Sequence, residues 1–592
     1  MRKLLLVSAM FVIGVLLAAI PDSGRAAPPS TVLQDDAIFL HRDPAAIQDA
    51  LRRAASIGID RIRLTAGWSV IAPDALDQQP PAGFDGSDPD AYPAHAWDNL
   101  DRAVTLVAAA GLKPMIDIGF WAPRWATASQ DDPLARFRTD IDPGQFAAFA
   151  AAVARRYRGD YVPRADQVVP PPAGAAAPDL LGALLGHRRV SAPAAAPPAA
   201  DPLPRVDLYT LWNEPNHPGF VLPQWRERDG TLQPDSPIRY RAMVAAAYPA
   251  VKAVSPGTTV LIGGTSSMGS SVPGRSGVPP LRFLRELACV DAQLQPITTG
   301  ACADFKPVPS DGWAHHPYSL HTDPDRAPRD PDLLPVARTA ALHDTLVALV
   351  QRGRLVGSHA SDLYLTEYGY ETKTPDPEGF ASLADQARLL AWAEFLGTST
   401  PGVKMWPQFL LEDRPAGPAG PRMRAFGDWQ TGLWFADGTP KPAATAFRTP
   451  TFAQCARRGK TPFTRVWARL RGAQAGTTAT VQVQSGAGWA TVPSAATMAM
   501  PPSATGPVPI GDDDALLRWL PGTPAATRVV WHTPAGVDVD GPDVPVQPCP
   551  AASIPAARPH RTPGRGRRPA TTRRKHGRAS ARADRTRRRH RR

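Results

Sequence analysis

Short apolar runs alternate with longer amphipathic segments across residues 31–450. This alternation is typical of repeated βα units, in which a buried strand is followed by a helix that covers a parallel sheet. The candidate strands are residues 37–40, 61–65, 113–118, 206–212, 259–263, 312–316, 363–367 and 403–409. The helix-like segments are residues 44–56, 97–110, 143–157, 237–254, 281–288, 336–354, 382–396 and 442–447.

Eight such units predict a TIM (β/α)8 barrel over residues 31–450, a fold that usually needs about 250 residues and tolerates insertions. One insertion is visible at residues 164–204, where Pro and Ala dominate. That composition buries little apolar surface, so we predict a flexible loop. An open doubly wound sheet is the competing fold. It normally carries a Gly-rich phosphate-binding turn after an early strand, and the sequence has none there.

The pattern changes after the predicted barrel. Residues 452–550 contain short strand-like runs among Gly, Pro and Ala turns, at residues 464–470, 478–483, 489–492 and 528–531. Short strands separated by such turns predict a small all-β sandwich domain. Residues 555–592 are rich in Arg, Pro, Thr and Gly, and this composition predicts a disordered basic tail.

The net charge of +12 originates in that tail. Residues 556–592 hold sixteen Lys and Arg against one acid, Asp584, so the rest of the chain carries −3. The basic balance therefore predicts no specific nucleic-acid partner. We expect the tail either to contact anionic cell-envelope polymers through screened attraction or to be a solubilising end without a partner.

The N-terminus has the pattern of an export signal. Arg2 and Lys3 precede an apolar run over residues 4–20, and small residues follow up to Ala26. We therefore expect residues 1–26 to be a cleaved signal peptide and the protein to be secreted or associated with the cell envelope. An uncleaved membrane anchor is the alternative, although the run is at the short end of what spans a bilayer. No transmembrane span is expected in the mature chain.

The chain contains four cysteines, an even number that fits an oxidising compartment. Proximity along the chain favours the pairs Cys289–Cys302 and Cys455–Cys549, although four cysteines allow three pairings. Metal binding is the alternative, but no Cys-x-x-Cys motif and no close spacing of a Cys with a His supports it.

Two predicted strands end in carboxylates. The fourth passes into Trp-Asn-Glu-Pro at residues 212–215, and the seventh into Thr-Glu-Tyr-Gly at residues 366–369. In a (β/α)8 barrel the active site lies at the C-terminal ends of the strands, and strands four and seven face each other across the mouth. Glu214 and Glu367 would therefore form a carboxylate pair, which is what cleavage of a glycosidic bond requires.

The two motifs resemble the acid/base and nucleophile signatures of clan A retaining glycoside hydrolases, close to the family 5 cellulase-like and family 39 xylosidase-like enzymes. The resemblance implies that Glu214 is the general acid/base and Glu367 the nucleophile. It also implies substrate-binding or positioning roles for five residues: Arg63, Asn213, His316, Tyr318 and Trp406. It implies neither a metal nor an organic cofactor. One departure is the end of strand three, where family 5 enzymes usually carry a His, whereas residues 116–121 of this chain, Ile-Asp-Ile-Gly-Phe-Trp, place Gly and aromatic residues there.

We therefore expect a secreted retaining β-glycoside hydrolase that cleaves O-glycosidic bonds of an oligosaccharide, polysaccharide or glycoside by double displacement. The negative charge of Glu367 is expected to raise the pKa of Glu214 so that it keeps its proton. The alternative is a catalytically silent barrel that binds carbohydrate or associates with the envelope. A carboxylate directly after a strand can also cap a helix, and Arg63 can be a structural ion pair.

Overall fold

The computed structural model describes residues 28–128, 132–133, 135–164, 201–376, 379–415, 429–458, 460–492, 508–509 and 515–549. The predicted signal peptide, the basic tail and nearly all of the predicted 164–204 insertion lie outside the described residues.

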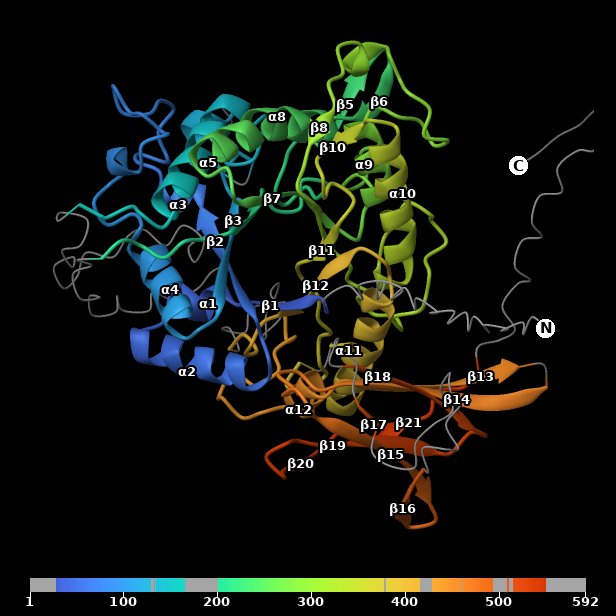
Figure 1. The fold of residues 1–592 in the computed structure, drawn as a ribbon. Helices are drawn as coiled ribbons and strands as arrows, with labels where there is room; N and C mark the ends of the chain where they lie inside the picture. The colour runs from blue at the N-terminus through green and yellow to red at the C-terminus, as the bar shows by residue number, and fades with distance from the viewer. Residues whose placement is uncertain are drawn as a thin grey trace, which may run out of the picture. The chain divides into compact units, whose positions relative to one another are not determined.

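Eight parallel strands close into a barrel whose strand order follows the chain (Figure 1). The strands are β1 (Ser30–Gln34), β2 (Arg61–Gly67), β3 (Lys113–Gly119), β4 (Leu208–Leu211), β7 (Thr259–Ser266), β9 (Trp313–His316), β11 (Leu363–Leu365) and β12 (Val403–Phe409). Pairing of β1 with both β2 and β12 closes the ring. The predicted (β/α)8 barrel is therefore confirmed.

The first predicted strand, residues 37–40, is wrong. The strand is Ser30–Gln34, and Asp36–Phe39 forms the short helix α1 instead. The four apolar residues at 37–40 form a run that has no period separating a strand from a buried helical turn, whereas the observed strand has only Val32 and Leu33 as apolar residues. Only the neighbours decide, because Val32 and Leu33 fit between β2 and β12.

Helices surround the strands in Figure 1. They are α2 (Pro44–Ser56), α3 (Trp68–Ile71), α4 (Asp98–Ala109), α5 (Pro143–Arg156), α8 (Ser236–Val254), α9 (Pro280–Leu287), α10 (Thr339–Gln351), α11 (Leu383–Thr398) and α12 (Pro442–Arg448). Local signals define several starts: Asp43 accepts from the first backbone N–H groups of α2, and Asp142 does so for α5, each followed by Pro at the first helical position.

The barrel interior has an apolar layer of side chains and, closer to the C-terminal ends of the strands, a polar layer. An apolar layer is formed by Val32, Met115, Leu208, Leu261, Ala314 and Met405. Side chains two residues apart on a strand point to the same face, so the next interior layer includes Gln34, Asp117, Thr210 and His316. The polar groups thus stand at the C-terminal ends of the strands, on an apolar floor.

Further sheets lie after the barrel, as the prediction of an all-β region requires. One contains β13 (Thr451–Arg458), β14 (Thr461–Arg469) and β18 (Ala515–Pro521). The other is built on β15 (Thr478–Ser485), β16 (Gly488–Thr491), β19 (Ala526–His532) and β20 (Asp538–Asp540), with β17 (Val508–Pro509) and β21 (Val544–Pro545) at its sides. Val466 and Leu516 of the first sheet share an apolar cluster with Val481, Val529 and Trp531 of the second.

Both predicted disulfides, Cys289–Cys302 and Cys455–Cys549, are present.

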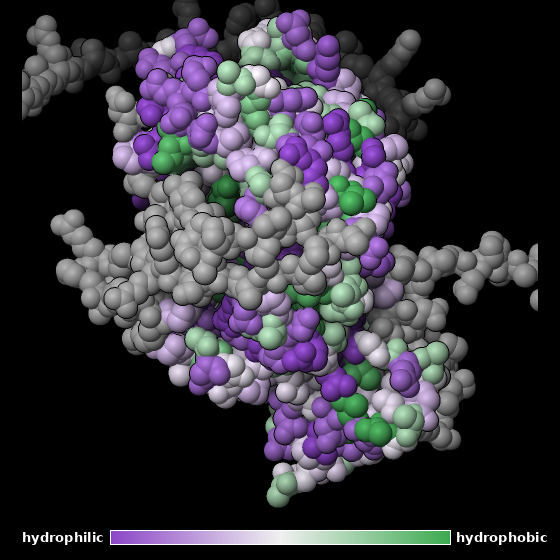
Figure 2. Space-filling view, turned by 90° about the vertical axis from the view of Figure 1, so that its left-hand side faces the viewer, coloured by the Kyte–Doolittle hydropathy of each residue, from purple (hydrophilic) through white to green (hydrophobic). Residues whose placement is uncertain are grey.

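Among the residues described, no helix has the length and apolar character that crossing a membrane demands. On the face in Figure 2, hydrophilic side chains predominate and hydrophobic ones occur in small separate groups.

Candidate active site

Glu214 and Glu367 meet at the barrel mouth. Glu214 follows β4 and Glu367 follows β11, and an oxygen of each carboxyl group lies within 4.8 Å of the other. Their side chains are 14% and 10% exposed, respectively. Two carboxyl groups 153 positions apart in the chain are thus brought into one nearly buried site.

Glu367 is held by a cation and a hydroxyl group. Arg63 Nη1 lies 2.6 Å from Oε1, and the Tyr318 hydroxyl donates to Oε2 at 3.3 Å. Burial raises the pKa of Glu367, while His316 and Arg63 act in the opposite direction and Glu214 adds to the rise. Direct contact with a guanidinium makes Glu367 the first of the two carboxyl groups to ionise.

None of the described cations contacts Glu214 directly. Burial raises its pKa to about 7, and His217, Arg63 and a hydrogen bond with Ser266 oppose that rise. The predicted cause was the charge of Glu367, and this is corrected: loss of hydration on burial is the leading cause. A buried carboxyl group without a cation partner retains its proton near neutral pH.

His316 lies between the two carboxyl groups. Its Nδ1 is 3.0 Å from Glu214 Oε1 and its Nε2 is 3.5 Å from Glu367 Oε1. Burial lowers the pKa of His316 to about 4, so the ring is neutral and carries one N–H. Assigning that N–H to Nε2 places a donor toward the ionised Glu367 and leaves Nδ1 to accept from protonated Glu214.

The neighbouring His315 points elsewhere. Its two ring nitrogens contact the Thr265 hydroxyl group at 2.9 Å and the Leu334 carbonyl oxygen at 2.7 Å. Both ring nitrogens of His315 are therefore hydrogen-bonded away from the carboxyl pair. Of the two histidines, His316 is the one that belongs to the site.

Arg63 is the centre of a buried polar network. Its Nη1 donates to Gln34 and Glu367, and its Nη2 donates to Asn213 Oδ1 at 3.0 Å and lies 3.2 Å from Asp117 Oδ1. Arg63 and Asp117 are fully buried. The structure thus brings together the predicted Arg63, Asn213, Glu214, His316, Tyr318 and Glu367.

Trp406 is the exception, and its predicted place at the site is wrong. The indole is 1% exposed, lies 5.4 Å from the Tyr368 ring, and a Cβ at Gly397 of α11 would meet it at 2.4 Å. It therefore packs outside the barrel. Met405, one residue earlier, belongs to the interior layer, and adjacent strand residues point to opposite faces.

Two aromatic residues, Phe409 and Trp429, pack around Tyr318, whose hydroxyl group contacts Glu367. Their rings lie 6.3 and 5.7 Å from that of Tyr318 and 5.3 Å from each other. Trp429 is 39% exposed, whereas Trp406 is covered. The alternation along β12 could have identified Phe409, since it shares the face of Met405.

Gln34 and Asp117 are the network members that the sequence analysis did not select. Gln34 is the last residue of β1, and Asp117 lies two residues before the end of β3, so in both strands a polar side chain near the C-terminal end was the signal in the sequence. Gln34 was missed because the first strand was placed too late in the chain.

The carboxyl pair could be considered as a metal site, because Glu214, His316 and Glu367 offer ligand atoms within 4.8 Å of one another. Arg63 already lies 2.6 Å from Glu367 Oε1, so a dication there would face a guanidinium. The electrostatics favour a carboxyl pair with separate protonation states over a dication site.

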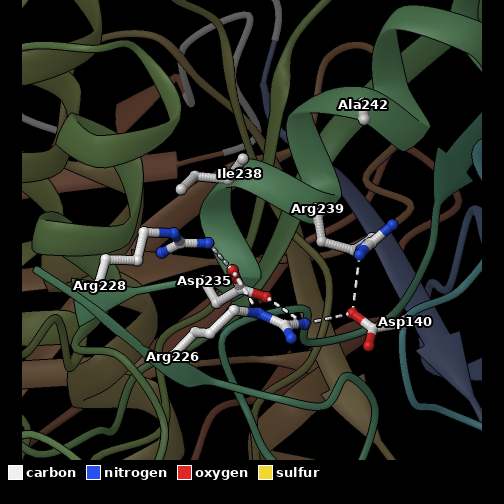
Figure 3. A pocket seen from close by; sticks show the side chains of 7 residues that line it. All are labelled: Asp140, Arg226, Arg228, Asp235, Ile238, Arg239 and Ala242. Atoms are coloured by element: carbon white, nitrogen blue, oxygen red, sulfur yellow. Dashed lines mark hydrogen bonds and ion pairs between the residues drawn. The ribbon is translucent and has the colours of Figure 1, made fainter. Parts of the chain in front are cut away.

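A separate cavity of about 370 Å³ lies beside the hairpin formed by β5 (Trp225–Arg228) and β6 (Thr231–Pro234) (Figure 3). Guanidinium and carboxylate groups alternate along it: Arg239 to Asp140 at 2.7 Å, Asp140 to Arg226 at 2.5 Å, Arg226 to Asp235 at 3.2 Å, and Arg228 against Asp235. The charges of these groups are paired with one another. The ion pairs that line the cavity therefore connect the hairpin to the start of α8.

The chain is similar in structure to several glycosidases. A GH5_18 protein from Streptomyces cattleya, solved with GlcNAc, is 14% identical with a TM-score of 0.39, over 71% of this chain and 79% of that one. A GH5_18 protein from Bifidobacterium longum subsp. infantis is 13% identical with a TM-score of 0.39, over 71% and 78%. An exo-beta-1,4-mannosidase from Opitutaceae bacterium strain TAV5 is 15% identical with a TM-score of 0.37, over 71% and 58%.

No protein-family model and no curated protein matches the sequence. At such low identities and TM-scores, the functional assignment depends on the site residues themselves.

Proposed function

We propose that the protein is a retaining β-glycoside hydrolase. One observation carries this proposal: two carboxyl groups whose oxygens lie within 4.8 Å of each other have different surroundings, one against a guanidinium and one without a cation. Retaining enzymes hold their carboxyl groups about 5–5.5 Å apart, whereas inverting enzymes need about 6.5–9.5 Å to admit a water.

The proposed reaction has two displacements. Glu367 attacks the anomeric carbon while Glu214 donates its proton to the leaving oxygen, which gives a glycosyl-enzyme ester and the free leaving group. Glu214, now ionised, removes a proton from water, whose oxygen attacks the same carbon and releases the sugar and Glu367. A pKa of about 7 for Glu214 suits both roles near neutral pH.

The neighbouring residues have defined parts in this proposal. Arg63 and Tyr318 keep Glu367 ionised and oriented. Asn213 Oδ1 is engaged by Arg63, so its amide N–H groups are what it offers to a sugar hydroxyl. Trp429 and Phe409 supply flat apolar faces for the C–H face of the bound sugar.

We also propose that residues 1–26 are a signal peptide and that the mature protein is secreted or held at the cell envelope. In this proposal residues 31–450 form the barrel domain, residues 452–550 a β-sandwich domain, and residues 555–592 a basic tail that contacts anionic envelope polymers. Two disulfides support an oxidising compartment.

The function is tested by incubating the protein with 2-deoxy-2-fluoro glycosides that carry good leaving groups, followed by peptide mapping. We expect a covalent adduct on Glu367, and the sugar that labels identifies the glycone. Glu367→Gln should abolish labelling. Glu214→Ala should lower kcat/KM by about 10²–10⁴ on substrates with poor leaving groups, and azide should yield a glycosyl azide of retained configuration.

The matched control is Glu286→Gln on α9, which removes a half-buried Glu that pairs with Arg282 away from the site. It should label and turn over like the unaltered protein. If no adduct forms and the unaltered protein and Glu214→Ala are alike in hydrolysing none of the glycosides tested, the silent carbohydrate-binding barrel is favoured.

A further inference from the structure

Arg63 serves two carboxylates at once. Each terminal nitrogen has two acceptors: Gln34 and Glu367 for Nη1, Asn213 and Asp117 for Nη2. These four partners come from different parts of the barrel, at β1, after β11, after β4 and on β3. Both terminal nitrogens of the guanidinium are therefore engaged, whereas Nε is buried without a hydrogen-bond partner among the described residues. Asp117 supplies the only charged partner besides Glu367 among the described contacts of Arg63.

Asp117 is placed at an energetic cost. Its Oδ1 accepts from Thr210 and faces Arg63, but Oδ2 is buried with no hydrogen-bond partner among the described residues. Gly119 leaves the space beside it, since a Cβ there would lie 3.0 Å from Oδ2. A half-satisfied buried carboxylate destabilises a fold, so stability alone does not account for this residue.

We propose that Asp117 is a positioning residue for Glu367: it shares the Arg63 guanidinium with the nucleophile, fixes its orientation and limits how far Arg63 neutralises Glu367. The inference rests on the proposed glycosidase function and deepens it. With Asp117 ionised, two carboxylates compete for one guanidinium, and Glu367 keeps more basicity than a simple ion pair would allow.

Among the residues that the structure describes, the charged and titratable groups that face Asp117 are Arg63 on β2, Asp36 on α1 and Tyr240 on α8. Burial raises the pKa of Asp117, Arg63 and the Thr210 hydroxyl oppose the rise, and Asp36 adds to it. Removing the charge of Asp117 leaves Glu367 as the only carboxylate on Arg63, so the pKa of Glu367 falls.

The test is the pH profile of kcat/KM for Asp117→Asn, measured on an aryl glycoside that the unaltered enzyme hydrolyses. We expect the acidic limb to move to lower pH by about one unit. We also expect kcat and the rate of fluoro-sugar labelling to fall about tenfold, with little change in KM. The same result is expected for Asp117→Ser, which removes the charge without adding an unpaired buried amide. Asp117→Ser replaces Asp117→Asn if the Asn variant does not fold.

The matched control is Asp207→Asn. Asp207 pairs at 2.6 Å with Arg61, which lies on β2 two residues before Arg63, and the Asp207 side chain is 46% exposed. The Asp207→Asn substitution removes an Asp–Arg pair that involves β2 but does not contact Glu214 or Glu367. The acidic limb of the pH profile of this variant should therefore match that of the unaltered enzyme.

An acidic limb of Asp117→Asn and Asp117→Ser that coincides with that of Asp207→Asn would overturn the inference while the proposed function stands. If the unaltered protein hydrolyses and labels with no glycoside, the proposed function fails instead. The pKa of Glu367 is then read by ¹³C NMR of glutamate-labelled protein, with Glu367→Gln for assignment. A downward shift in Asp117→Asn supports the shared guanidinium, and an unchanged value contradicts it.

Discussion

The carboxyl group of Glu214 links chemistry to stability. It is nearly buried, contacts no cation in the part of the chain that the structure describes, and has a pKa raised from an ordinary value of 4.5 to about 7. Between these two values the folded protein binds a proton that the unfolded chain releases. The neutral carboxyl group therefore stabilises the fold fully below pH 4.5, and this contribution is lost as pH rises through about 7.

Glu214→Gln should remove this dependence, because glutamine stays neutral at every pH. The difference in unfolding free energy between Glu214→Gln and the unaltered protein is expected to change in favour of the variant by about 3 kcal/mol from pH 4.5 to pH 8. Denaturant melts at several pH values measure it, with Glu286→Gln as control. A difference that is constant with pH would show that Glu214 is not the titrating group.

At the scale of elements, helix α11 joins the barrel to the first β-sheet after it. Phe395 of α11 stacks on Phe452 of β13 with ring centroids 4.9 Å apart. Glu394, one residue earlier, is buried and pairs with Arg471 at 2.6 Å and Arg469 at 3.4 Å. Two buried guanidinium groups thus depend on one carboxylate of a barrel helix.

Glu394→Ala should destabilise the protein by about 3–5 kcal/mol, because it leaves two buried cations without their partner. Asp385→Asn is the matched control on the same helix. Its exposed pair with Arg388, three residues apart, should be worth less than about 1 kcal/mol. Urea unfolding followed by tryptophan fluorescence compares them. Equal losses for the two variants would mean that the buried pair does not hold the sheet to α11.

At the scale of the whole molecule, the disulfides close loops of very different length. Cys289 and Cys302 are 13 positions apart, whereas Cys455 and Cys549 are 94 apart and join β13 to the segment after β21. All four cysteines are paired. A cross-link that closes a longer loop removes more disorder from the unfolded chain.

We therefore expect the unfolding free energy to fall by about 4–5 kcal/mol in the double variant Cys455→Ser/Cys549→Ser and by about 3 kcal/mol in Cys289→Ser/Cys302→Ser.

If the protein is exported as proposed, its intact mass from the culture medium should correspond to a chain that starts near Ala27 with no free thiol. A full-length cytoplasmic product, or melts that do not change on removal of either disulfide, would contradict these expectations.

Local signals along the chain were sufficient for much of the fold. The helix Pro44–Ser56 was predicted with its observed bounds, since Asp43 caps it and Pro44 begins it. Strands such as Lys113–Gly119 were predicted to within a residue because continuous burial leaves a continuous apolar run. The strands β13 and β18 were missed, because pairing with β14 rather than their own composition makes them strands.

The sequence by itself determined that eight βα units follow one another and that Glu214 and Glu367 close the fourth and seventh strands, because periodicity, caps and strand ends are short-range properties. Only the tertiary structure decided that Trp406 faces outward and Phe409 inward, that Asp117 and Glu367 share Arg63, and that burial rather than a neighbouring charge raises the pKa of Glu214. Those properties depend on barrel closure, which sets the facing of each strand and removes water from the groups at its mouth.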